Sequence, residues 1–372
     1  MIKVTDVEVM VYRFPLDNPV QTSFGLMHDR PMVIVKLTSN TGISGWGEVW
    51  CNFPNVGAEH RARLVTSIFT QLLLSKPFDN PATAFDFLTN STWVLGLQTG
   101  EIGPLAQCIA GIEIALSDIH AKQQELPIWK LYGGTTDTVP IYASGINPTN
   151  VEQTACAALD EGYRDMKLKI GFGHDRDVAN IRLLRDIVGP SGSLMVDANQ
   201  AWTVDHAAEM ITDLGPFDLT WLEEPIAKDR PIAEWQKLRK TATMPLAGGE
   251  NLQGKDEFAA SIADDILHVI QPDLAKWGGL SRTIPVAQNI CAAGRRYCPH
   301  YLGGGIGLVA SAHALAAVGG DGLLEVDFNH NPLRSALVGD MLSGKDGVAR
   351  LGDKPGLGYE PDLAAVSTYQ VA

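Results

Sequence analysis

Between residues 135 and 329 the chain alternates short apolar runs with longer stretches of helical periodicity. Seven of the apolar runs end in a charged residue or a histidine, and successive ends lie 23 to 28 residues apart. That interval accommodates one strand, one helix and two loops. Alternating strands and helices predict parallel strands joined by crossovers, and eight such units can close into a barrel. We therefore expect an α/β fold with a (β/α)7β-type TIM-like barrel at 135–329, whose first strand lies at 139–145.

The residues that end these runs are types that carry chemistry. In chain order they are Lys169, with Lys167 two residues before it, Asp197, Glu223, Glu250, Asp273, His300 and Glu325. In a parallel barrel the C-terminal ends of the strands surround one mouth, where active sites lie. We expect these side chains to converge there.

The first 50 residues alternate with a period of two, which predicts a small antiparallel sheet. A Pro- and Gly-rich segment at 15–31 separates its first two strands and is long for a hairpin, so we expect a loop that covers a site. Helical periodicity follows from 57 to 131. We predict an α+β capping domain at 1–134, completed by a tail at 330–372 that folds back onto it.

Composition narrows the class of protein. The chain is 45% hydrophobic and its formal net charge is −14, which argues against nucleic-acid and anionic-membrane partners. Its five cysteines include no CxxC pair, so a disulfide framework or zinc site is not expected. The N-terminal stretch lacks the apolar core of a signal peptide, and no apolar stretch reads as a membrane span. We expect a cytoplasmic protein.

Three carboxylates, Asp197, Glu223 and Glu250, end consecutive predicted strands. Brought together, they would repel one another unless a cation lay between them, and hard oxygen ligands suit Mg²⁺. The alternative is that each is an ordinary surface acid, which three residues in register disfavour. Asn199 shares a face with Asp197, and Glu224 points the other way from Glu223, so we expect both behind the metal ligands.

Lys167 and Lys169 lie two residues apart in a predicted strand and so share a face. If that face is the barrel interior, burial and mutual repulsion lower the lysine pKa, which produces a usable base. The alternative is a solvated pair on an exposed strand. Apolar residues at the intervening positions favour the interior, because a barrel strand packs its other face against helices.

Asp273 and His300 end neighbouring predicted strands. A carboxylate bonded to one imidazole nitrogen makes the other nitrogen a better base. A lone histidine is more often structural, and only its register singles out His300. Glu325 ends the eighth strand and is a candidate to hydrogen-bond a substrate oxygen.

A metal flanked by a lysine base and a histidine base suits removal of a proton next to a carboxylate. The metal would hold the carboxylate oxygens and stabilise the enediolate that forms. We therefore expect a small-molecule carboxylate substrate.

Several motifs together resemble the enolase superfamily in its mandelate racemase subgroup, over essentially the whole chain. They are MKLKIGF, DANQAW, WLEEP, AGGEN, QPDLAKWGG and PHYLGGGIGL, with GWGE near 45 and PGLG in the tail. The resemblance implies a capping domain over the barrel, Asp197, Glu223 and Glu250 as Mg²⁺ ligands, Lys169 as one base and Asp273–His300 as the other. It also implies a homo-oligomer, often an octamer.

The resemblance assigns further roles. Lys167 would tune Lys169 and touch the substrate carboxylate, and Glu325 would donate a hydrogen bond to it. Lys276 stands where the muconate-lactonizing subgroup keeps a second catalytic lysine, but His300 favours the racemase-type arrangement, with Lys276 behind the site. Two capping loops would choose the substrate, with these candidate residues: Phe24, His28, Arg30, Trp50 and Asn52.

Within the subgroup, KIGFG and EVDFNHNPLR look most like the branch of galactarolactone cycloisomerase and acid-sugar enzymes. We therefore expect a sugar-acid dehydratase or lactone cycloisomerase. The alternative is a racemase or epimerase of a 2-hydroxy acid, and a more distant one is a non-catalytic ligand-binding barrel.

The sequence disfavours three other chemistries that occur on barrel folds. An amidohydrolase would want two histidines two residues apart, and the chain has none. A Schiff-base aldolase would leave the three carboxylates unexplained. The glycines at 303–305 are compatible with phosphate binding, but making room beside His300 is the preferred interpretation.

Overall fold

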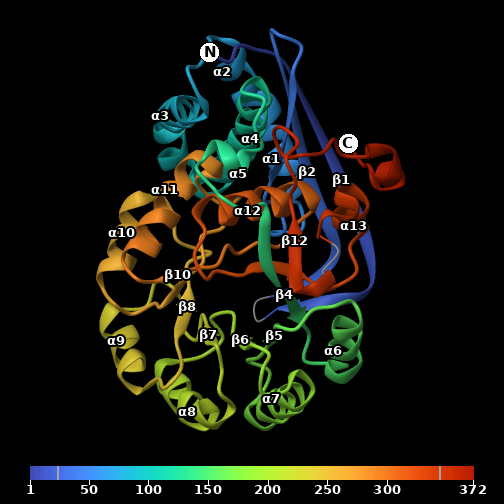
Figure 1. The fold of residues 1–372 in the computed structure, drawn as a ribbon. Helices are drawn as coiled ribbons and strands as arrows, with labels where there is room; N and C mark the ends of the chain where they lie inside the picture. The colour runs from blue at the N-terminus through green and yellow to red at the C-terminus, as the bar shows by residue number, and fades with distance from the viewer. Residues whose placement is uncertain (23–24, 343–344) are drawn as a thin grey trace.

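The computed structural model describes residues 1–22, 25–342 and 345–372. It consists of a three-stranded antiparallel sheet with helices, set over a curled parallel sheet with helices around it (Figure 1). The mixed α/β architecture with a barrel and an N-terminal cap, expected from the sequence, is confirmed.

The cap sheet is formed by β1 (Val4–Thr22), β2 (Gly25–Ser39) and β3 (Ser44–Val49), in that order. Over residues 15–22 and 25–31 the expected loop is wrong, because these residues extend the two strands: Pro15 pairs with Asp29 and, after an irregularity, Val20 pairs with Met27. Proline is tolerated there because β1 is an edge strand, where an N–H is not needed by a further neighbour. The long hairpin carries cap residues down to the barrel mouth (Figure 1).

The cap helices follow the predicted periodicity. They are α1 (Gly57–Leu64), η1 (Val65–Phe69), α2 (Thr70–Leu74), α3 (Pro81–Thr99), α4 (Ile102–Gln123) and α5 (Ile128–Leu131). By length and composition α4 alone among the described helices would cross a membrane, yet it is mostly buried, packed against β3 and α3. A Cβ at Gly45 or Gly47 would strike the α4 backbone, so the two glycines let β3 lie directly on that helix.

Eight strands form the described barrel sheet. They are β4 (Thr138–Ile146), β5 (Met166–Lys169), β6 (Leu194–Asp197), β7 (Trp221–Glu223), β8 (Leu246–Gly248), β9 (Val269–Ile270), β10 (Arg296–Tyr297) and β11 (Leu324–Asp327). All seven pairings are parallel, running from β10 back to β4 and then to β11. Leu323 N donates to Cys298 Sγ at 3.4 Å across the seam between β10 and β11.

Seven helices connect these strands, as a (β/α)7β barrel requires. They are α6 (Val151–Asp160), α7 (His174–Val188), α8 (Val204–Leu214), α9 (Ile232–Thr241), α10 (Gly254–Ala263), α11 (Gly279–Ala292) and α12 (Gly305–Val318). A one-turn 3-10 segment, η2 (Gly215–Phe217), follows α8.

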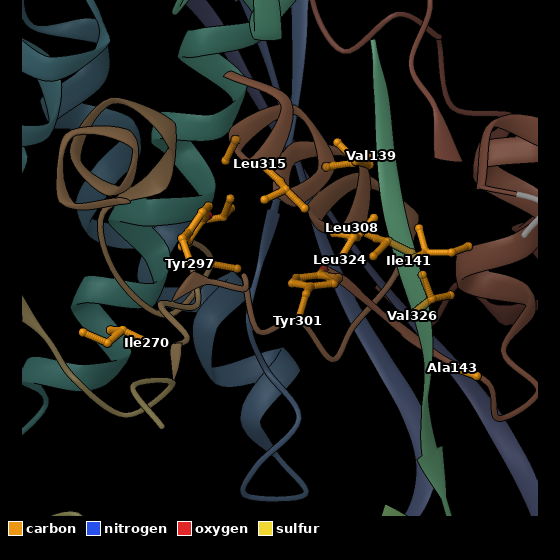
Figure 2. Close-up of a cluster of buried hydrophobic side chains, with 14 of the residues drawn as sticks. Val139, Ile141, Ala143, Ile270, Tyr297, Tyr301, Leu308, Leu315, Leu324 and Val326 are labelled. Carbon is orange, nitrogen blue, oxygen red and sulfur yellow. The ribbon is translucent and has the colours of Figure 1, made fainter. Parts of the chain in front are cut away.

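Strand alternation divides the core into two layers. In β4, Ile141 and Ala143 join the large cluster between sheet and helices, whereas Tyr142 joins a smaller cluster with Trp221 inside the barrel. Figure 2 shows Leu308 of α12 close to Ile141 and other strand side chains of the outer layer. This two-sided burial sets which strand-end side chains point into the mouth.

The C-terminal segment contains α13 (Pro332–Val338), η3 (Gly339–Leu342), η4 (Lys345–Gly347), β12 (Val348–Arg350) and η5 (Leu363–Tyr369). β12 pairs antiparallel with β4, so part of the tail lies on the barrel. The last residues contact the cap, where Trp46 Nε1 donates to Glu360 at 2.5 Å and Leu357 N donates to Asp118 at 2.8 Å.

Candidate active site

A cavity of about 810 Å³ lies at the C-terminal ends of the barrel strands, under the cap. Six of the residues singled out in the sequence line it from the barrel side: Lys169, Asn199, Glu250, Lys276, His300 and Glu325. The spacing of strand ends along the chain therefore located the mouth.

Lys167 lies beneath this cavity and is fully buried. Its Nζ donates to Glu223 Oε1 at 2.7 Å and Oε2 at 2.8 Å, and lies 2.8 Å from Glu325 Oε1. It is not among the cavity-lining residues. In this arrangement the lysine ties β5 to β7 and β11, and its contact with a substrate carboxylate stays a prediction.

Lys169 points into the cavity, and its Nζ donates to Asp197 Oδ2 at 2.5 Å. Burial by itself lowers the lysine pKa, but the carboxylates of Asp197, Glu223 and Glu325 together outweigh it, and the pKa of Lys169 is raised. The expectation of a lowered pKa was wrong in this arrangement. Repulsion from Lys167 is outweighed because Lys169 pairs with Asp197 on the neighbouring strand β6, while Lys167 pairs with Glu223 of β7 and Glu325 of β11.

Asp197, Glu223 and Glu250 follow neighbouring strands, and each contacts a cationic side chain. Glu250 lies 3.0 Å from Lys276 Nζ and 2.6 Å from His300 Nε2. Among the described residues, no three Asp, Glu, His or Cys side chains already converge in metal-ligand geometry. The predicted ligands are therefore adjacent in the fold, with their oxygens turned to lysine and histidine.

The charge of this region fits a divalent cation. Burial, with the charges of Asp197 and Glu325 adding to it, raises the pKa of Glu223 to about 7 against the opposing effect of Lys167. Burial and the charges of Glu250 and Asp197 likewise raise the pKa of Glu224 to about 8. Carboxylates this crowded are stabilised by a cation, and hard oxygen donors suit Mg²⁺.

Glu224 lies behind these acids and does not line the cavity, whereas Asn199, expected behind them as well, lines the cavity beside Asp197. Asn199 donates to both Asp197 oxygens, through N at 2.8 Å and Nδ2 at 3.0 Å. Glu224 accepts from Gln200 Nε2 and Asn251 Nδ2, both at 3.0 Å. These four hydrogen bonds hold the carboxylates of Asp197 and Glu224 in place.

His300 and Asp273 form the predicted pair, with Nδ1 and Oδ2 2.8 Å apart. The other Asp273 oxygen accepts from the backbone N of Ala275 at 2.9 Å and of Lys276 at 3.1 Å. The imidazole is thereby oriented so that Nε2 faces the cavity. Burial lowers the His300 pKa, but Glu250 foremost among the nearby carboxylates raises it well above its ordinary value.

Glu325 is held by Lys167 and by the hydroxyl of Ser144. Burial opposes ionisation, but Lys167, His300 and Lys169 lower the pKa of Glu325 to about 2. In this arrangement the ionised carboxylate only accepts, and the hydrogen bond to a substrate that the resemblance implies stays a prediction.

Three of the five predicted specificity residues, Arg30, Trp50 and Asn52, line the cavity. Asn52 Nδ2 donates to the carbonyl of Leu302 at 2.6 Å, and Lys276 Nζ lies 4.9 Å from the Trp50 ring. His28 is exposed and not among the lining residues. Phe24 lies outside the described residues.

Four polar residues that were not predicted line the cavity from the first and last barrel strands and the loops after them: Ser144, Asn147, Asp327 and Asn329. Asp327 follows Glu325 by two positions in β11 and so shares its face, a signal that was available. The others carry no comparable pattern.

The glycines at 303–305 serve an anion of the protein itself. Glu48 of β3 accepts from Gly304 N at 2.5 Å and Gly307 N at 3.0 Å, at the start of α12. A Cβ at Gly303 or Gly304 would come within 2.9 Å of Glu48 Oε1. The helix N-terminus that would bind phosphate is occupied by this carboxylate.

Two family models together match most of the chain. Residues 4–133 match the mandelate racemase / muconate lactonizing enzyme N-terminal domain, and residues 150–365 match the enolase C-terminal domain-like family. The chain therefore belongs to the mandelate racemase / muconate lactonizing enzyme family of the enolase superfamily, and it is an enzyme of lyase or isomerase type.

Named relatives share the whole length. D-galactarolactone cycloisomerase of Agrobacterium fabrum is 28% identical, covering 100% of this chain and 99% of its own. 3,6-anhydro-alpha-L-galactonate cycloisomerase of Streptomyces coelicolor is 30% identical, covering 95% of each.

Solved structures are similar too. A mandelate racemase/muconate lactonizing enzyme from Bordetella bronchiseptica superposes with a TM-score of 0.94 at 50% identity, covering 99% of both chains. A Streptomyces coelicolor racemase with bound magnesium has a TM-score of 0.87 at 28% identity, covering 99% of this chain and 100% of its own.

Proposed function

We propose that this enzyme is a Mg²⁺-dependent sugar-acid dehydratase or sugar-acid lactone cycloisomerase that removes the proton next to the substrate carboxylate. The observation that carries the proposal is the placement of two candidate bases in one cavity. Lys169 ends β5, and His300, paired with Asp273, follows β10. Three strand ends that carry carboxylates lie between them. Relatives named as sugar-acid cycloisomerases support the substrate class.

Asp197, Glu223 and Glu250 would hold the Mg²⁺. When bound, the cation supplies positive charge against the negative charge that develops on the substrate carboxylate. Lys169 takes a proton only after its contact with Asp197 is released, because in that ion pair its ammonium stays protonated.

One of the two bases removes the α-proton, the carbon–oxygen bond at the β-carbon breaks, and the other group protonates the departing oxygen or the product carbon. Lys167 keeps Glu223 and Glu325 in place from below. Ionised Glu325 accepts a hydrogen bond from a substrate hydroxyl. The cap residues Trp50 and Asn52 exclude water from the mouth.

The same pair of bases supports a racemase, in which one group removes the α-proton and the other returns it to the opposite face. The similarity to a racemase structure favours this as the second candidate. Proton NMR in D₂O on aldonates, aldarates and their lactones distinguishes the two, since a racemase exchanges the α-proton without losing oxygen. No exchange and no product across the library would reject both.

A further inference from the structure

We propose that the β4–β11 side of the cavity binds a hydroxyl group at the end of the substrate remote from its reacting carboxylate. The preferred substrates are then aldonates or their lactones, with one carboxylate, rather than aldarates, with a carboxylate at each end. This inference rests on the proposed function and refines it.

Asn329, in the loop after β11, has a side-chain amide whose orientation is fixed by its partners. Its Nδ2 donates to the carbonyl oxygen of Gly145 at 3.0 Å and to Asp327 Oδ1 at 2.6 Å. Both partners only accept, so the amide has one orientation. Gly145 has a φ of +72°, and a Cβ there would come within 2.6 Å of both side chains, so this glycine leaves room for the network.

Asn147, in the loop after β4, is oriented in turn. Because Asn329 presents Oδ1 to it, Asn147 must donate through Nδ2, and that bond is 2.8 Å long. The Asn147 Oδ1 is consequently an acceptor with no described partner, although it is buried and its residue lines the cavity.

Arg30 reaches the same network from the cap. Its side chain is only 3% exposed, and Nη2 lies 2.7 Å from Asp327 Oδ2. Nη1 lies 3.2 Å from the sulfur of Met27, while Nε is a buried donor for which the described residues provide no partner. Asp327 and Asn329 together thus connect Arg30, with its unpartnered donor Nε, to Asn147, with its unpartnered acceptor Oδ1.

A hydroxyl group satisfies both atoms, because it accepts from Arg30 Nε and donates to Asn147 Oδ1. A carboxylate would satisfy only the arginine. It would leave the amide oxygen of Asn147 without a donor and would stand beside the Asp327 carboxylate, which costs free energy in a buried site even with Arg334 Nη1 3.5 Å from Asp327 Oδ2.

The position in the barrel suits the remote end of a substrate. The candidate metal ligands follow β6, β7 and β8, and β4 and β11 lie on the other side of the mouth. A substrate whose carboxylate lies at the metal ligands extends toward Asn147 and Arg30.

The test compares kcat/KM for three substrates of equal chain length: an aldonate, its analogue lacking the terminal hydroxyl, and the aldarate. We expect the aldonate to be preferred at least tenfold over each, because a buried polar pair rejects a ligand that leaves it unpartnered. Asn147→Ala should reduce the preference over the deoxy analogue to within about threefold. Arg30→Lys, which keeps a cation beside Asp327 but removes Nε–H, is the second variant.

Asn180→Ala is the matched control, because Asn180 donates to the carbonyl of Pro148 near the same loop and does not line the cavity. It should preserve the preference. A wild-type enzyme that prefers the aldarate, or preferences unchanged in both Asn147→Ala and Arg30→Lys, would overturn the proposed subsite.

Failure of the proposed function is distinguishable. If none of the three acids exchanges its α-proton in D₂O, the chemistry is wrong, and the subsite is then tested by calorimetric Kd values for the aldonate and its deoxy analogue. Tighter binding of the aldonate by the wild type, lost in Asn147→Ala, supports the subsite. Equal Kd values reject it.

Discussion

The Glu48 carboxylate in the cap accepts a hydrogen bond of 2.5 Å from the backbone N of Gly304, four residues after His300. One oxygen thus connects β3 to the loop that carries a proposed base. The GWGE motif and the glycines at 303–305 contribute to the same contact. Gly45 and Gly47 let β3 lie directly against α4, and Glu48 reaches the start of α12.

Removing this contact should destabilise the protein. Glu48→Ala leaves the N–H groups of Gly304 and Gly307 without a charged acceptor, so we expect the free energy of unfolding to fall by about 3 kcal/mol, and Glu48→Gln to lose less. Urea denaturation measures both. Glu8→Ala, which removes an exposed cap ion pair with Lys36, should cost less than about 1 kcal/mol. Equal losses in Glu48→Ala and Glu8→Ala would contradict the assigned role.

Divalent cation binding should stabilise the fold. Mg²⁺ at about 100 times its Kd adds about 2.7 kcal/mol, measurable as a higher midpoint of thermal unfolding. Glu250→Gln should abolish most of this increase, and EDTA should abolish turnover. The control is Glu257→Gln. Glu257 lies on α10 outside the cavity, and its carboxylate pairs with Lys228. A Glu250→Gln protein that responds to Mg²⁺ like the wild type would remove Glu250 from the ligand set.

Asp273→Asn should act through His300. The Asp273 hydrogen bond is one of the interactions that raise the pKa of His300, so the acidic limb of the kcat/KM profile should move to lower pH. Turnover should fall by about 10²-fold, the lower range for a general base, with little change in KM. A purely structural role for Asp273 would lower activity without moving the profile.

His313 provides a pH dependence of stability away from the site. Its Nδ1 accepts from Trp129 N and its Nε2 donates to the carbonyl of Leu357, both at 3.2 Å. Burial lowers its pKa from 6.5 to about 4. The neutral form is thus favoured in the folded state, and its stabilisation is complete above pH 6.5 and lost as pH falls toward 4.

We expect this residue to contribute about 3 kcal/mol to the loss of stability across that window. His313→Gln should reduce the loss in urea titrations between pH 7 and 4.5, whereas His206→Gln, on α8 and partly exposed, should not. Parallel curves for wild type and His313→Gln would show that His313 does not protonate on unfolding.

The period of strand ends predicted the barrel, its mouth and the neighbours of Lys169 and His300, because the geometry of a parallel barrel translates spacing directly into position. It did not predict which carboxylate pairs with which lysine or histidine. The lysine pKa was misjudged because only Lys167 and Lys169 were considered, whereas Asp197 and Glu223 on the next two strands decide it.

The remote side of the cavity was also beyond the pattern. Asn147 and Asn329 lie in loops, where amide side chains are common and no periodicity marks them. Their importance depends on Gly145 and Asp327 fixing the amide orientations, which is a property of three-dimensional contacts. The hairpin at 15–31 was hidden for a related reason, since its prolines suggest a loop unless the strand is known to be an edge.

The most direct test follows the α-proton by NMR in D₂O with Mg²⁺, on aldonates, aldarates and their lactones, for the wild type, Lys169→Ala and His300→Asn. The two-base account predicts product from the wild type and a loss of at least about 10²-fold in each variant. Deuterium exchange without net product would identify a racemase or epimerase. Turnover that survives both substitutions would contradict the assignment of Lys169 and His300 as the bases and turn attention to Lys276.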